Sequence, residues 1–97
     1  SDIEYIATRN AIMKNGTILQ TGSTRELVVQ MEGRVFEASI DPRDLSRLEE
    51  KVQVVNVRNE ADGSVSLRYL GTPDDIPQAR PQEPRLEDLY LELFPRK

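Results

Sequence analysis

The chain has 97 residues, of which 37% are apolar and 31% are charged, and its net charge at neutral pH is −4. This length suits one modest hydrophobic core, and the acidic balance argues against binding to nucleic acid or to an anionic membrane surface. Cysteine and histidine are both absent, which removes disulfides, thiolate catalysis, and the commonest general base and metal ligand.

The amino-terminal residues carry two local structural signals. Ser1 and Glu4 have the S-x-x-E spacing of a capping box, which predicts a short helix over residues 2–8. Two apolar stretches then flank the pair Asn15-Gly16, the preferred dipeptide for a tight turn with positive φ at both central residues. We therefore expect a helix followed by a β-hairpin.

A second helix should follow the hairpin. Ser23 and Glu26 repeat the capping-box spacing, and apolar residues recur behind them as far as Gly33, a residue typical of helix ends. This pattern predicts a helix over 23–31. Because the pattern changes at Arg34, we expect the hairpin and this helix to form a separate or loosely attached unit.

From residue 34 onward the pattern indicates an α+β domain. Alternating or β-branched residues predict three strands, near 35–40, 53–59 and 64–70. Asp41 followed by Pro42 is typical of a helix start, so a helix should cover 42–50. We expect a small, mostly antiparallel sheet in the order β-α-β-β-α, preceded by the hairpin and a short helix.

The carboxyl-terminal third combines a proline-rich segment with a last helix. Residues 72–84 contain four prolines and few apolar residues, which predicts a surface loop or an extended linker. A helix should cover 85–94, because Leu86, Leu89, Tyr90 and Leu93 form one apolar stripe. The acidic residues of this helix are expected to face water, namely Glu87, Asp88 and Glu92.

Two interpretations of the apolar stripe remain open. We favour the one in which the helix closes the domain over its sheet, but the excess apolar surface could instead serve a partner. The hairpin raises the same question, since an unpaired strand edge invites pairing with another chain. We therefore predict a homodimer of the isolated chain, with exchange of the hairpin as one route to it. The candidate partner contacts are Ile12, Ile18, Leu19, Tyr90, Leu91 and Phe94.

Other patterns that suggest a functional site have the wrong spacing. Gly16–Thr24 superficially resembles a phosphate-binding loop, but five residues separate its glycines and Ser23 stands where the lysine belongs. The acidic residues near turns match no calcium-binding loop, and the arginines are spread among acids. We predict no catalytic, cofactor-binding or metal-binding residue, no nucleic-acid partner, and no direct membrane insertion.

Two segments, one toward each end of the chain, follow longer motifs. Arg9 to Ser23 reads R-x-A-I-M-x-x-G-x-I-x-x-x-G-S, and Gly22 to Leu27 continues it as G-S-T-R-E-L. Leu86 to Leu91 reads Leu-Glu-Asp-Leu-Tyr-Leu. These segments resemble the end of the ATP-binding subunit of bacterial ABC transporters of the drug-export (ABC-2) class. The nucleotide loop, catalytic acidic strand, signature motif and switch histidine of that family are missing.

The resemblance implies that the chain begins just after the switch histidine, with 1–33 the end of the ATPase domain and 34–97 a C-terminal accessory domain. The parent subunit would use ATP and Mg and couple ATP hydrolysis to export, beside a membrane-spanning transporter subunit at the cytoplasmic face of the cell membrane. The fragment itself would be a non-catalytic regulatory or dimerisation region. The alternative is a small-molecule-binding regulatory module of α+β type, which needs a concave apolar site with a few convergent polar groups.

Overall fold

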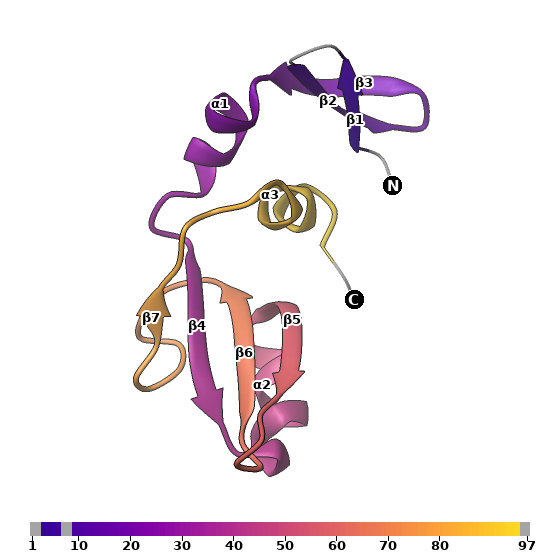
Figure 1. Ribbon diagram of the computed structural model, residues 1–97. Coiled ribbons are helices and arrows are strands. Elements are labelled where there is room, and N and C mark those ends of the chain that lie inside the picture. The colour runs from indigo at the N-terminus through magenta and orange to yellow at the C-terminus, as the bar shows by residue number, and fades with distance from the viewer. Residues whose placement is uncertain (1–2, 7–8, 96–97) are drawn as a thin grey trace.

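The computed structural model describes residues 3–6 and 9–95, which form two antiparallel sheets and three helices in an elongated body of 42 × 25 × 23 Å (Figure 1). The strands are β1 (Ile3–Ile6), β2 (Arg9–Lys14), β3 (Thr17–Gly22), β4 (Val35–Ile40), β5 (Gln53–Asn59), β6 (Val65–Leu70) and β7 (Arg80–Pro81). The helices are α1 (Thr24–Val28), α2 (Leu45–Lys51) and α3 (Leu86–Leu93), with 3₁₀ turns η1 (Val29–Met31) and η2 (Pro42–Asp44). The α+β class predicted from the sequence is confirmed.

The first sheet has the order β1-β2-β3, so its amino-terminal strand lies where we predicted a helix. The helix expected over 2–8 is therefore wrong for residues 3–6, while residues 2, 7 and 8 lie outside the described residues. Strand β1 pairs with β2 from Ile3 opposite Ile12 to Ile6 opposite Arg9. Isoleucine and tyrosine favour this extended pairing, and so short a helix would be marginal on its own.

The hairpin between β2 and β3 is confirmed, together with the capped helix behind it. Asn15 and Gly16 both have positive φ, 53° and 80°, as the tight turn requires. The Ser23 hydroxyl accepts the Glu26 N–H at 3.1 Å, and the Ser23 N–H donates to the Glu26 carboxylate at 2.8 Å. Helix α1 and turn η1 then run to Met31, and Gly33 ends the segment with a φ of 77°.

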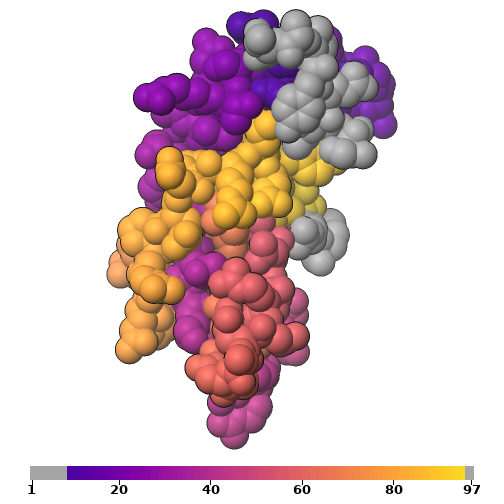
Figure 2. Space-filling model, in the orientation of Figure 1, coloured from indigo at the N-terminus to yellow at the C-terminus, as the bar shows by residue number. Residues whose placement is uncertain are grey.

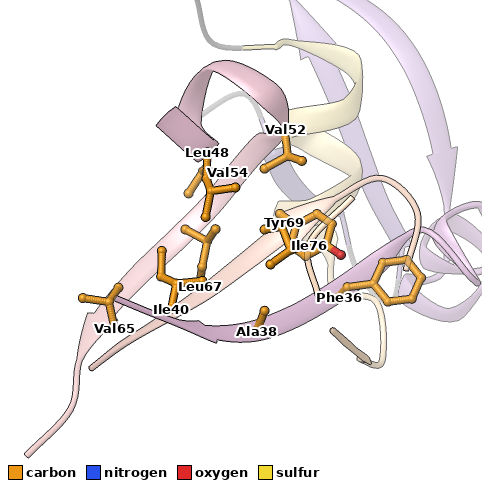
Figure 3. Packing of buried hydrophobic residues seen from close by; sticks show 10 residues of the cluster. All are labelled: Phe36, Ala38, Ile40, Leu48, Val52, Val54, Val65, Leu67, Tyr69 and Ile76. Carbon is orange, nitrogen blue, oxygen red and sulfur yellow. The ribbon is translucent and has the colours of Figure 1, made fainter. Parts of the chain in front are cut away.

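The second sheet has the order β5-β6-β4-β7, which confirms the three predicted strands and adds a fourth. Side chains from one face of this sheet pack against Leu48 of α2 (Figure 3). The turn η2, which leads into α2, begins at Asp41, whose carboxylate accepts the Arg43 N–H at 2.8 Å as predicted for a helix start. The cluster consists of Phe36, Ala38, Ile40, Leu48, Val52, Val54, Val65, Leu67, Tyr69 and Ile76.

The proline-rich segment is more firmly held than a surface linker. Ile76 is only 2% exposed and belongs to the same buried cluster, where Figure 3 shows it close to the label of Tyr69. Further along, Arg80 and Pro81 pair with Glu37 and Phe36 of β4. The prolines in the sequence correctly predict a loop. They do not predict that Ile76, within this loop, packs in the hydrophobic core.

Helix α3 joins the hairpin region to the second sheet. A second buried cluster takes residues from both sides of the expected boundary near residue 33. Helix α3 lies between the hairpin region and the second sheet (Figure 2). The expected loose attachment of the hairpin and α1 is therefore wrong, because both share a core with β4, β5, β6 and α3. The cluster consists of Ile12, Leu27, Met31, Val35, Val55, Leu70, Leu89 and Leu91.

Candidate functional site

The three hairpin residues expected to contact a partner separate into two groups. Ile12 is fully buried in the chain's own core, whereas Ile18 and Leu19 are 53% and 45% exposed. The exposure has a local cause: Ile12 lies opposite Gln20 and Met13 opposite Ile18, so Leu19 has no counterpart on β2. Such a bulge interrupts the alternation of faces along a strand. It places two adjacent apolar side chains in solvent on β3.

The three residues expected to contact a partner from the last helix are mostly used within the chain. Leu91 is 5% exposed and belongs to the second cluster. Tyr90 and Phe94 are half-buried, and their ring centroids lie 4.7 Å apart. The Lys14 ammonium lies 5.4 Å from the centroid of the Phe94 ring, so the end of β2 meets the end of α3. The apolar stripe therefore mainly closes the fold, which is the interpretation we favoured.

Asp88 was expected to face water, and this expectation is wrong. Its side chain is fully buried and binds Arg68 of β6, which is itself 4% exposed. The Arg68 guanidinium also donates to the Glu83 carbonyl at 2.9 Å, and the hydrogen bonds to Asp88 raise the pKa of Arg68. Nothing in the spacing of the helix pattern links these two positions, which are 20 residues apart. The buried ion pair therefore attaches α3 to the second sheet.

Asn10 is a second polar residue that sequence patterns did not single out. It is 2% exposed, and its amide nitrogen donates to the Thr24 hydroxyl at 3.0 Å and to the Gly22 carbonyl at 3.4 Å. Its Oδ1 atom is buried without a hydrogen-bond partner among the described residues. Asn10 thereby ties β2 to the start of α1, with one acceptor left unused.

A groove lies between α2 and the segment 75–78. Its volume is about 430 Å³, within the range of small-molecule sites. Three nearly buried side chains form its floor, namely Ile40, Leu48 and Ile76. The accessible lining is polar and carries both signs of charge, with Asp41, Asp44, Arg47, Lys51, Asp75 and Gln78 among its residues.

Most of the charges on the helix side of this groove are already paired. Arg47 lies 3.3 Å from Asp44. Asp41 binds the side chain of Arg43, which holds the pKa of Asp41 below its usual value. Across the groove, Asp75 accepts the Thr72 N–H at 2.9 Å through one oxygen. The Lys51 ammonium has no hydrogen bond or ion pair with any described residue.

Two further features are absent from the described residues. Between residues 3–6 and 9–95, no group of three or more acidic side chains lies close enough together to hold a metal ion. Within the same ranges, no helix has the length and apolar character needed to cross a membrane.

No family model, curated protein or solved structure matches the chain.

Proposed function

We propose that the chain is the non-catalytic C-terminal region of an ABC export ATPase, where it supports regulation and dimerisation at the inner face of the cell membrane. The support lies in two segments that resemble this family, Arg9 to Ser23 and Leu86 to Leu91. The first forms a hairpin leading into a capped helix, and the second forms most of α3. The parent subunit, with its ATP and Mg, would supply the catalytic residues that this chain lacks.

The observation that carries the dimerisation role is the exposed pair Ile18 and Leu19 on an edge strand. Strand β3 ends the order β1-β2-β3, so one of its sides has no neighbouring strand among the described residues. Proteins normally protect such edges with charges or prolines. The strand reads Thr-Ile-Leu-Gln-Thr-Gly and contains neither. A second copy of the hairpin can cover it, and in the parent the ATPase sheet would lie beside it.

Light scattering on two matched variants tests dimerisation. The unmodified chain should be a dimer at high concentration, and Leu19→Glu should be a monomer because it places a charge in the interface. Val29→Glu is the control, since Val29 is also an exposed apolar residue, at 57%, but lies in η1. If the unmodified chain were a monomer, or if both variants lost the dimer equally, the proposed role would be contradicted.

Two further measurements test the transporter assignment itself. Calorimetric titration with Mg-ATP should give no binding heat, because the fragment lacks every nucleotide-binding motif of the family; binding would overturn the non-catalytic role. The coding sequence upstream of Ser1 should specify a histidine a few positions earlier and a phosphate-loop motif far before it. A reading frame without them would remove the transporter assignment.

A second candidate function is a small-molecule-binding regulatory module. The observation that favours it is the groove beside α2, which has a suitable volume and polar groups from two segments, while its accessible lining is polar instead of the apolar surface expected from the sequence. Titration of small polar molecules against the chain, followed by amide chemical shifts in the groove, tests this candidate.

A further inference from the structure

Some of the charged side chains that line the groove beside α2 form ion pairs and others do not. The unpaired charges determine which ligands the groove can bind. Asp44 and Arg47 neutralise each other, and Asp41 is held by Arg43. Two opposite charges then remain without an ionic partner among the described residues. They are Lys51 at the end of α2 and Asp75 in the segment facing it.

The remaining charges exclude several classes of ligand. A nucleotide or other multiply charged anion would approach three carboxylates, those of Asp41, Asp44 and Asp75. A polyvalent cation would meet Arg47 and Lys51, and an apolar molecule would find a floor whose side chains are at most 8% exposed. The lining suits a compact molecule with one charge of each sign.

We propose that this groove binds a small zwitterion of the amino-acid or dipeptide type. The ligand carboxylate pairs with the Lys51 ammonium, and the ligand ammonium pairs with Asp75, each as a charge-assisted hydrogen bond. Asp75 remains oriented because its other contact, the Thr72 N–H, holds one of its oxygens. This assignment rests on the small-molecule candidate function and is independent of the transporter assignment.

Amide chemical shifts of the intact chain test the proposal with three related probes. Alanyl-alanine carries both charges, N-acetyl-alanine only the carboxylate, and alanine amide only the ammonium. Alanyl-alanine should shift amides in 39–41, 44–51 and 75–78. Each single-charge probe should bind at least about tenfold more weakly, since loss of one ionic contact of about 1.4 kcal/mol has this effect.

Two conservative variants assign the contacts. Lys51→Gln and Asp75→Asn should each weaken alanyl-alanine binding, and the asparagine still accepts the Thr72 N–H. Glu50→Gln and Asp74→Asn are the matched controls, because both residues neighbour the contacts but lie outside the groove lining; binding should not change. Equal weakening in the controls would overturn the assignment.

The outcomes separate the inference from the function on which it rests. Equal binding of N-acetyl-alanine and alanyl-alanine would overturn the zwitterion assignment and leave a small-molecule groove. No groove shift with any probe, at any concentration below precipitation, would overturn the inference and remove the support for the small-molecule candidate.

Discussion

Arg68 on β6 and Asp88 on α3 form a two-point ion pair, with Nε donating to Oδ1 at 3.0 Å and Nη2 to Oδ2 at 2.6 Å. The same Asp88 carboxylate accepts the backbone N–H of Arg85 at 2.7 Å. One side chain therefore both caps the start of α3 and attaches the helix to the second sheet. Helix α3 also packs against the hairpin region. The pair therefore helps to connect the hairpin region to the second sheet.

Replacing Asp88 alone should be strongly destabilising. Asp88→Ala leaves the Arg68 guanidinium buried without its counter-ion, which typically costs about 3–5 kcal/mol of unfolding free energy. The double variant Arg68→Met/Asp88→Leu removes both charges and should retain more stability than the single one. Urea denaturation measures both. A single variant that loses less than about 1 kcal/mol would contradict the structural role given to the pair.

An exposed ion pair on the same helix provides the control. Arg34 lies 3.2 Å from Glu92, but their side chains are 46% and 37% exposed. Water screens such pairs, so Glu92→Ala should cost at most about 1 kcal/mol. Similar losses for Glu92→Ala and Asp88→Ala would mean that burial does not set the strength of the contact.

Ile76 should behave as a core residue although it lies in a proline-rich loop. Ile76→Ala removes a side chain that is 2% exposed within the first cluster, and such truncations cost about 2–5 kcal/mol. Pro73→Ala, at an exposed position of the same loop, should change stability by no more than about 0.5 kcal/mol. Thermal and urea unfolding would check both, and equal effects would show that the loop is not anchored through Ile76.

Local signals in the sequence predicted the elements whose cause is local. The turn at Asn15-Gly16 needs only positive φ, the helix at Ser23 needs only its reciprocal cap, and the strand over Val35–Ile40 needs only alternation. Each depends on residues within a few positions of one another. Such patterns also gave the α+β class and the order of the second sheet's main elements.

Features that depend on distant residues could not be predicted in this way. Asp88 follows the spacing of a water-facing residue, and only the fold reveals Arg68 opposite it. Residues 3–6 carry a helix-start signal at Glu4, but pairing with β2 makes them a strand. The groove beside α2 likewise requires Lys51 and Asp75 to line one hollow, which no spacing along the chain encodes.

Gly16 should not accept alanine without a loss of stability. Its φ of 80° is strained for a residue with a Cβ, although no atom lies within 4 Å of the position that a Cβ would take. Gly16→Ala should therefore cost about 1–2 kcal/mol through backbone strain alone. Asn15→Gly, at the neighbouring position with a φ of 53°, should be close to neutral. Urea denaturation compares them, and an equally stable Gly16→Ala variant would contradict the turn geometry.

The stability of the α1 cap should fall in acid. Hydrogen bonds from the Ser23 backbone and hydroxyl, followed by the charge of Arg9, lower the pKa of Glu26 below 4.5. Because the folded pKa is lower than the unfolded one, this carboxylate stabilises the fold above pH 4.5 and loses its contribution as pH falls through the folded pKa. In Glu26→Gln the amide oxygen still accepts the Ser23 N–H but does not titrate. The urea midpoint of this variant, followed from neutral pH down to about pH 3, should therefore fall less steeply than that of the parent chain. Parallel curves would show that Glu26 does not contribute to the acid sensitivity of the fold.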